Sequence, residues 1–180
     1  MIKTKDLGIS FSGQKIFSDV SVNINKKEKI GFIGRNGSGK STFLKIIIGR
    51  LEQDDGEVIM PKGYKIGYLD QHIKFTHKSV VDEVCSVLSG DREYEIWKGE
   101  SILTGLGFTD EEMSKDPEGF SGGNQVKINL AKLLLEEPDM LLLDEPTNYL
   151  DIHSIKWLKN FLNDWRGELI LVTHDRSFMN

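Results

Sequence analysis

A glycine-rich segment at residues 34–42, GRNGSGKST, has the residue types and spacing of a phosphate-binding loop. It matches G-x-x-x-x-G-K-[ST] through Gly34, Gly39, Lys40 and Ser41. Glycines let backbone N–H groups converge on phosphate oxygens, and a helix that begins after the loop points its positive end at the same anion. We expect Lys40 to reach the β- and γ-phosphates of a nucleoside triphosphate and Ser41 to bind Mg²⁺. The remaining loop residues are expected to line the phosphates: Arg35, Asn36, Gly37, Ser38 and, near the α-phosphate, Thr42.

Two consecutive carboxylates, Asp144 and Glu145, follow the apolar run MLLL at residues 140–143. An unbroken apolar run is typical of a buried parallel strand, and residues at the carboxyl end of such a strand face the crevice where ligands bind. Asp144 is expected to hold Mg²⁺, and Glu145 is expected to orient and deprotonate the water that attacks the terminal phosphate. The alternative is that both carboxylates simply begin a solvated loop.

The segments around the glycine loop alternate between strand and helix patterns. Residues 1–28 have the period-two apolar spacing of antiparallel strands, and KIGFIG at 29–34 is a short strand that ends at the loop. STFLKIII has a helical pattern, with Gly49 as its predicted end. The same alternation in the second half of the chain predicts a mostly parallel sheet covered by helices.

Residues 78–118 lack strand patterns and are expected to form a small helical insertion. SVVD at 79–82 and TDEE at 109–112 are both capping-box patterns. A further helix is expected after Asp151, with one apolar stripe made of Ile152, Ile155, Leu158, Phe161, Leu162 and Trp165.

The composition is that of an ordinary globular protein, since 38% of the residues are hydrophobic and 28% are charged. The formal net charge of −5 argues against attraction of the whole surface to nucleic acid. No stretch reaches the roughly 18 uninterrupted apolar residues of a membrane span, and the N-terminus has no signal-peptide core, so a cytoplasmic location is expected. The single cysteine, Cys85, excludes an internal disulfide and is expected to be a small core residue.

Five further motifs occur in the order that is found in an ATP-binding cassette (ABC) domain. Phe11 precedes the glycine loop, YLDQ ends at Gln71, FSGGNQ at 120–125 resembles the family signature, NYLD at 148–151 resembles the D-loop, and VTHDR contains His174. The match runs over almost the whole chain, so the sequence is identified as a member of the ABC family. The resemblance implies an α/β P-loop NTPase fold of the ABC type over residues 1–180, with an antiparallel N-terminal β piece, a mostly parallel sheet and a helical subdomain near 78–118. It also implies that the family's final strands lie beyond residue 180.

The resemblance assigns roles to single residues on the ATP side. Phe11 would stack on adenine, and it could stack on guanine in the same way. The alternative is that Phe11 is an ordinary core phenylalanine. Gln71 would sense Mg²⁺ and the attacking water, or it is an ordinary polar loop residue. His174 would hydrogen-bond to the γ-phosphate, or it is a structural histidine at a strand end.

A second anion-binding terminus is implied at the signature. Ser121, Gly122 and Gly123 open a helix, and in this family that terminus meets the γ-phosphate of ATP held by an opposite cassette. Without the resemblance, Ser121 would be only a helix cap. Asp151 is expected both to cap the following helix and to serve in the D-loop. The implied activity is hydrolysis of ATP, with Mg²⁺, between two paired cassettes.

EPTNYLD at residues 145–151 looks more like the soluble subfamily F than like a transporter cassette. Members of that subfamily carry two cassettes on one chain, lack membrane domains and mostly act on ribosomes. The implied partners are therefore a second cassette, from the same parent chain or a second copy, and the ribosome or its RNA, without direct membrane insertion. The sequence departs from the subfamily pattern in three ways. It contains a single cassette, and the 49 residues between Gln71 and Ser121 leave little room for an inserted arm. The signature also has Asn124 where glutamine is common.

Two other functions fit the same motifs. One is the nucleotide-binding subunit of a membrane transporter, which would need a partner with spanning helices. The other is a fragment that binds ATP as a switch and does not hydrolyse it.

Overall fold

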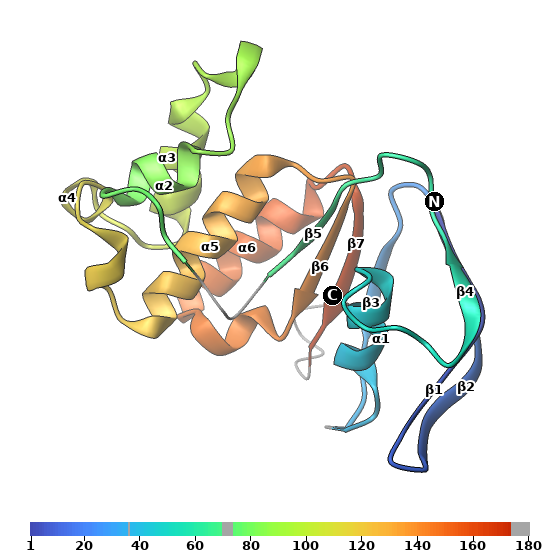
Figure 1. The fold of residues 1–180 in the computed structure, drawn as a ribbon. Coiled ribbons are helices and arrows are strands. Elements are labelled where there is room, and N and C mark those ends of the chain that lie inside the picture. Colours follow the sequence, from blue (N-terminus) through green and yellow to red (C-terminus); the bar gives the residue numbers. More distant parts are fainter. Residues whose placement is uncertain (36, 70–73, 174–180) are drawn as a thin grey trace. The chain divides into compact units, whose positions relative to one another are not determined.

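The structure is a computed structural model that describes residues 1–35, 37–69 and 74–173 (Figure 1). The chain divides into two compact units. The first comprises Met1–Tyr68, Asp139–Glu145 and the chain from Arg166 onward, and the second comprises Leu69–Pro138 and Pro146–Trp165.

The first unit contains the predicted antiparallel sheet, with the strand order β2-β1-β4. Its strands are β1 (Ile2–Phe11), β2 (Gln14–Ile24) and β4 (Asp55–Ile59). β1 and β2 form a hairpin in which Ile2 lies opposite Ile24. The two-residue connection, Ser12 and Gly13, has φ values of 48° and 80°. Positive φ at both positions matches the right-handed twist of paired strands.

The first unit also contains a parallel sheet, with the strand order β3-β7-β6-β5. Its strands are β3 (Lys29–Phe32), β7 (Glu168–Val172), β6 (Met140–Asp144) and β5 (Ile66–Tyr68), and all three neighbouring pairs are parallel. All five residues of β7 and the first four of β6 are buried. The apolar run at residues 140–143 was thus correctly predicted to be a buried strand of a parallel sheet.

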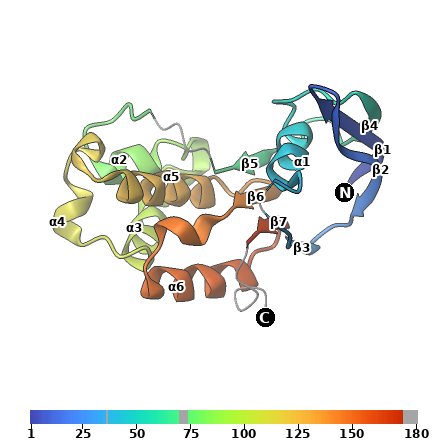
Figure 2. The ribbon, with the colours of Figure 1, turned by 90° about the horizontal axis from the view of Figure 1, so that it is seen from below.

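Helix α1 (Lys40–Ile47) packs between the two sheets of the first unit (Figure 2). Its buried residues join one apolar core with residues of both sheets: Phe43, Leu44, Ile46 and Ile47 from the helix, Ile2 and Ile24 from the antiparallel sheet, and Met140, Leu142, Ile170 and Val172 from the parallel sheet. The Phe43 ring meets the rings of Phe17 and Phe32 edge-on. The helix stops at the predicted Gly49, whose φ of 71° suits glycine and whose N–H bonds to the Ile46 carbonyl.

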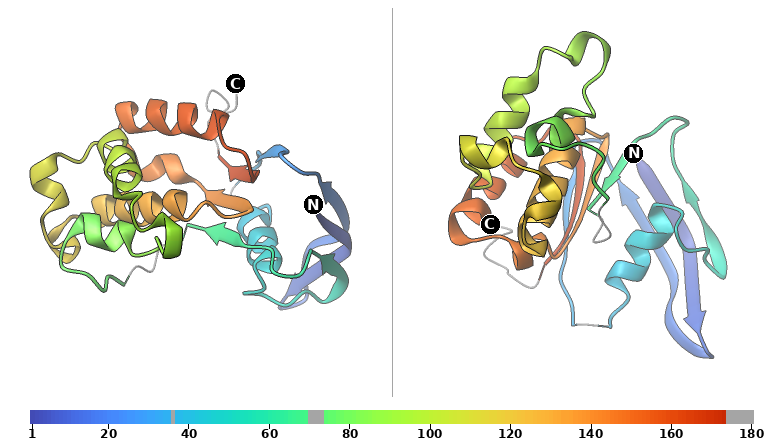
Figure 3. Two further views of the ribbon diagram at one scale, coloured as in Figure 1. Left: turned by 90° about the horizontal axis from the view of Figure 1, so that it is seen from above. Right: turned by 60° about the vertical axis from the view of Figure 1, so that its left-hand side comes forward.

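The described part of the second unit contains only helices and loops (Figure 3). The helices are α2 (Val80–Cys85), η1 (Gly90–Arg92), α3 (Ile96–Gly105), α4 (Asp110–Met113), η2 (Pro117–Gly119), α5 (Gly122–Glu136), η3 (Pro146–Tyr149) and α6 (Ile152–Asn163). α5 contacts α2 and α3, and α3 also contacts α6. Fully buried side chains from four helices and the end of α3 form its interior: Val80, Val84, Leu103, Leu106, Ile128, Leu134 and Leu158. Cys85 is only half-buried, and burial together with nearby carboxylates raises the pKa of its thiol to about 11.

Local sequence signals set the ends of these helices. The predicted capping box at α4 is complete, because the Thr109 hydroxyl accepts from the Glu112 N–H and the Glu112 carboxylate accepts from the Thr109 N–H. Ser79 caps α2, but the Asp82 carboxylate accepts from the Ser79 hydroxyl instead of closing a capping box. α5 ends at Glu136, and its C-cap, Glu137, adopts a left-handed φ of 53° just before Pro138.

One residue of the predicted α6 stripe is not on the buried face. Ile152 is 82% exposed, whereas Ser154, Leu158 and Leu162 are the buried residues of α6. Ile152 precedes Leu158 by six residues, which is well short of two full helical turns, so it points to another side of the helix. None of the helices in the described ranges is long and apolar enough to cross a membrane.

Candidate functional site

Three strands of the parallel sheet end at the same level in the first unit. Phe32, the last residue of β3, and Asp144, the last residue of β6, both lie in register with Val172, the last residue of β7. The Thr173 N–H also donates to the Phe32 carbonyl. The glycine loop, the two carboxylates and the segment after β7 therefore all begin at one carboxyl edge of the sheet, which is where parallel sheets bind ligands.

The glycine loop leads directly into the N-terminus of α1. Gly39 is the N-cap, with a φ of 88°, and no side chain caps the helix. A Cβ at Gly39 would lie 2.8 Å from Cγ2 of Ile16 and 3.1 Å from a ring carbon of Phe17, so both conformation and space require glycine. The first N–H groups of a helix have no partner within it. The N–H groups in the first turn of α1 thus have no partner within the helix and lie at its positive end, next to the loop.

Lys40 folds its ammonium group back into the loop. Its Nζ donates to the carbonyls of Gly34 and Arg35, at 2.8 Å and 3.0 Å, and the Ser38 N–H donates to the Arg35 carbonyl. A Cβ at Gly34 would lie 3.0 Å from the Ser38 hydroxyl. The loop is therefore tightly wound around one positive charge, which is the arrangement that a polyphosphate needs. Ser41 and Thr42 follow in the first turn of α1, and Asn36 lies outside the described residues.

Asp144 and Glu145 lie at the adjacent strand end and are both half-buried. Glu145 has a φ of 50°, and its N–H donates to the Val172 carbonyl at 2.9 Å. A positive φ is costly for a residue with a side chain and persists where the surrounding structure enforces it, which is common at functional sites. The carboxylates therefore occupy a constrained strand end and not an unconstrained loop.

The protein oxygens at this strand end could bind a magnesium ion only if phosphate oxygens supplied some of its other ligands. No group of three or more His, Cys, Asp or Glu residues that could hold a metal occurs among the described residues. Mg²⁺ usually keeps several waters and binds through one or two protein oxygens plus substrate phosphates. Ser41 and Asp144 supply such oxygens.

The predicted base-stacking residue, Phe11, is exposed. Phe11 ends β1 and is 45% exposed, so the alternative of a core phenylalanine is wrong. Gln71 and His174 lie outside the described residues.

The predicted signature opens α5 in the second unit. Ser121 is the N-cap, and its hydroxyl accepts from the Asn124 N–H. A Cβ built at Gly122 or Gly123 would meet no atom within 4 Å. Neither glycine has a positive φ. Neither packing within the chain nor the backbone conformation therefore explains why residues 122 and 123 are glycine.

Asp151 caps α6, as predicted. Its carboxylate accepts from the Ser154 N–H at 2.9 Å and from the Lys127 ammonium at 2.7 Å. The hydrogen bond from Lys127, with the one from the Ser154 N–H, holds the pKa of the Asp151 carboxyl well below its usual range. Asp151 is thus a fixed negative charge at neutral pH.

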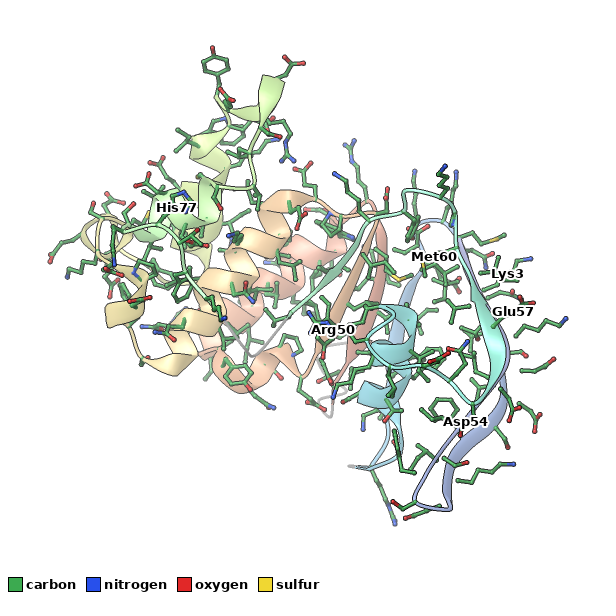
Figure 4. The ribbon with its side chains drawn as sticks, viewed as in Figure 1. Lys3, Arg50, Asp54, Glu57, Met60 and His77 are labelled. Carbon is green, nitrogen blue, oxygen red and sulfur yellow. The ribbon has the colours of Figure 1, made fainter. Side chains whose placement is uncertain are left out.

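Sequence reasoning missed the buried charges of this unit. Glu83 is 1% exposed and accepts from the N–H groups of Thr76 and His77, at 2.8 Å and 3.0 Å, and from the Lys132 ammonium. Burial alone would raise the pKa of Glu83, but these donors outweigh it and lower the pKa to about 2. His77 lies on the loop that leads to α2 (Figure 4), a few residues after Gln71. The available signal was a glutamate three residues after Val80, on the apolar side of a helix.

Comparisons with known proteins agree with this geometry. Residues 17–148 match the model of the family described as "ABC transporter". The protein YfmM of Bacillus subtilis, named an uncharacterized ABC transporter ATP-binding protein, is 37% identical over all of this chain and 43% of its own length. The ATP-binding protein Uup of Buchnera aphidicola is 38% identical over 99% of this chain and 31% of its own length. The chain therefore spans less than half the length of these relatives.

A solved structure shows the same fold. A dimeric ATP-binding cassette in a post-hydrolysis state, bound to ADP and phosphate, superposes with a TM-score of 0.78 over 99% of this chain and 90% of its own, at 22% identity. The ABC-type α/β fold, with its antiparallel N-terminal sheet, parallel sheet and helices, is thereby confirmed. From the extent of the family match and the identity to its members, this chain belongs to the ABC transporter family of ATP-binding cassettes.

Proposed function

We propose that this chain binds ATP with Mg²⁺ and hydrolyses the ATP when it is paired with a second cassette. One observation carries the proposal: the lysine-bearing glycine loop and the Asp144–Glu145 pair begin at the same register level of one parallel sheet. A loop that binds a polyphosphate and a carboxylate that can accept a proton are the two requirements of phosphoryl transfer to water.

Binding rests on backbone donors and one cation. Backbone N–H groups of the glycine loop and the positive end of α1 take the phosphate oxygens, and Lys40 exchanges its contacts with two loop carbonyls for contacts with phosphate. The exposed ring of Phe11 stacks on the base. Ser41 and Asp144 hold the magnesium ion, which supplies charge neutralisation at the phosphates.

Hydrolysis rests on Glu145. Water attacks the γ-phosphorus, the bond to the bridging oxygen breaks, and ADP and phosphate result. Glu145 orients the water and accepts its proton, and its constrained backbone fixes where the carboxylate starts. We assign Gln71 and His174 to the magnesium ion and the γ-phosphate on the resemblance alone.

Pairing is supported by the glycines of the signature. Glycine in a helix costs about 0.5–1 kcal/mol relative to alanine, and Gly122 and Gly123 have open space where a side chain would stand. Close approach by another molecule explains their presence. We assign that approach to the ATP of a second cassette, with Ser121 and Asp151 on the same pairing surface. The similar cassette bound to ADP and phosphate is itself a dimer.

We further propose that the cassette is of the subfamily F type and acts on the ribosome. The NYLD sequence at residues 148–151 supports this branch. The proposal treats residues 1–180 as one nucleotide-binding domain, with residues 78–118 as its helical insertion. A transporter subunit is the second candidate, because the family description and the name of YfmM both mention ABC transporters.

Replacement of Glu145 tests the enzymatic proposal. Glu145→Gln keeps the shape of the side chain and removes the base, so we expect turnover to fall at least 100-fold while ATP affinity stays within threefold. Turnover per chain of the unaltered protein should rise with protein concentration, because only pairs are active. Phosphate release and calorimetric ATP binding measure the two quantities.

The matched control is Glu52→Gln, which alters an exposed carboxylate in the same unit and should leave both quantities unchanged. Equal turnover in Glu145→Gln and the unaltered protein would remove Glu145 from its role. In the presence of ATP, Glu145→Gln should cosediment with ribosomes. Recovery with membranes instead would favour the transporter subunit.

A further inference from the structure

A buried lysine links three helices of the second unit. Lys127 lies in α5, is 9% exposed, and is flanked by the buried residues Val126 and Ile128. Its ammonium group donates to the Asp151 carboxylate at 2.7 Å, to the Leu106 carbonyl at 3.2 Å and to the Ser154 hydroxyl at 3.3 Å. Leu106 is the C-cap of α3, whereas Asp151 and Ser154 belong to the first turn of α6.

The contacts account for every donor of the ammonium group. A lysine has three N–H donors, and Lys127 has three acceptors in reach. The Ser154 hydroxyl lies 3.0 Å from both the Leu106 carbonyl and the Asp151 carboxylate, so the acceptors are linked to one another. A buried charge with all its partners in place holds them in one arrangement, whereas loss of one partner leaves a charge uncompensated.

The residue that follows Leu106 is a glycine in a left-handed conformation. Gly107 has a φ of 91°, and a Cβ there would lie 3.7 Å from the Ser154 hydroxyl and 3.9 Å from both the Asp151 carboxylate and the Lys127 ammonium. The backbone conformation favours glycine at this position. The left-handed turn at Gly107 thus directly follows the carbonyl that accepts from Lys127.

Packing alone does not explain a lysine at this place. Buried helix positions are normally apolar, and lysine is almost never buried unless it is paired. Capping of α6 needs only the bond from the Ser154 N–H to the Asp151 carboxylate. The lysine adds a link from the start of α6 to α5, the helix that begins at the signature residues Ser121–Gly123.

We propose that Lys127 is a positioning residue for cassette pairing, which holds Asp151 and the N-terminus of α5 in one fixed arrangement. This inference rests on the proposed function, because Asp151 and Ser121–Gly123 are the segments that we assign to the pairing surface. We assign no nucleotide contact to Lys127. It acts through Asp151 and through the helix that carries the signature.

The test compares the turnover and ATP affinity of two variants. Lys127→Met keeps the approximate length of the side chain and removes its charge, whereas Lys127→Arg keeps the charge. Lys127→Met should lower turnover at least tenfold and leave ATP affinity at the glycine loop within twofold. Lys127→Arg should restore turnover to within threefold. The control, Lys115→Met, removes an exposed lysine that pairs with Glu111 in the same unit and should change nothing.

A second measurement needs no nucleotide. The amides of Gln125 and Ile155 close the first turns of α5 and α6 by bonding to the Ser121 and Asp151 carbonyls. Lys127→Met should speed hydrogen exchange at both amides at least tenfold, and Lys127→Arg should restore protection. If the unaltered chain has no turnover, the proposed function fails, and the exchange rates decide the positioning role by themselves.

Three results would overturn the positioning role: unchanged turnover in Lys127→Met, equal losses of turnover and of ATP affinity, or exchange at Gln125 and Ile155 that Lys127→Met leaves unaltered. The first shows that the link is dispensable. The second indicates general unfolding. The third shows that the two helix starts do not depend on the lysine.

Discussion

A single ammonium group organises the phosphate loop. Lys40 bonds to the carbonyls of Gly34 and Arg35, so its charge lies inside the loop before any anion is bound. The same charge and the positive end of α1 reinforce each other, because both favour a negative ligand. The residue therefore prepares the loop for phosphate and also contributes to holding the loop's shape.

Lys40→Ala should weaken ATP binding at least tenfold, since the mutant loop keeps its backbone donors and loses its cation. Isothermal titration of ATP with Mg²⁺ measures the effect. Lys45→Ala is the matched control, because Lys45 lies on the exposed side of the same helix. Equal ATP affinity in both variants would contradict the phosphate contact of Lys40.

Residues that belong to a short contiguous motif could be predicted from the sequence. Hydrogen-bond partners that lie far apart in the sequence could not. Gly34, Gly39 and Lys40 form a contiguous pattern whose spacing reflects the loop itself. The bond between Lys127 and Asp151 joins residues 24 positions apart, and the bond between Glu83 and Lys132 joins residues 49 positions apart. No spacing rule anticipates such pairs, since they exist only once the helices have packed.

At the scale of elements, the contact between α3 and α6 depends on a missing side chain. A Cβ at Gly105 would lie 2.0 Å from Cε2 of Trp157 and 2.1 Å from its Nε1. The Trp157 ring also packs against that of Phe161. The aromatic side of α6 therefore lies directly on the backbone at the end of α3.

Gly105→Ala should lower the free energy of unfolding by about 1–3 kcal/mol, because overpacking outweighs the gain in helix propensity. Urea denaturation measures this loss. Gly119→Ala is the control, since a Cβ there meets no atom within 4 Å. Adding Trp157→Leu to Gly105→Ala should recover part of the lost free energy of unfolding. An unchanged free energy of unfolding in Gly105→Ala alone would show that the Trp157 ring moves aside at no cost.

Element types were predicted well where the apolar pattern was strong, and less well where packing decides. The unbroken leucines of β6 and the glycine at the end of α1 indicated the correct elements. Ile152 was placed on the wrong face, because its spacing of six residues from Leu158 is well short of two full helical turns. The capping box predicted at Ser79 is incomplete, because the Asp82 carboxylate accepts from the Ser79 hydroxyl and not from the Ser79 N–H.

At the scale of the molecule, the stability of the second unit should depend on pH through Glu83. Its pKa in the folded state is about 2, below the reference value of 4.5. The stabilisation is complete above pH 4.5 and is lost as the pH falls toward 2, because the unfolded chain takes up the proton first. The contribution is on the order of 2 kcal/mol.

Urea unfolding followed by circular dichroism at pH 7, 4 and 3 measures this dependence. Glu83→Gln should be less stable at pH 7 and should show a shallower decline with acid than the unaltered chain. Glu93→Gln, a change of an exposed carboxylate, should follow the unaltered chain. Identical acid slopes in Glu83→Gln and the unaltered chain would contradict the role of Glu83.

The division of the chain into two units has an optical consequence. All three tryptophans, Trp97, Trp157 and Trp165, belong to the second unit. Indole fluorescence therefore arises from residues of the helical unit alone. Trp97, at 62% exposure, should be quenched by iodide far more readily than the two half-buried indoles. Iodide quenching can thus separate the emission of Trp97 from that of the other two indoles in the same unit.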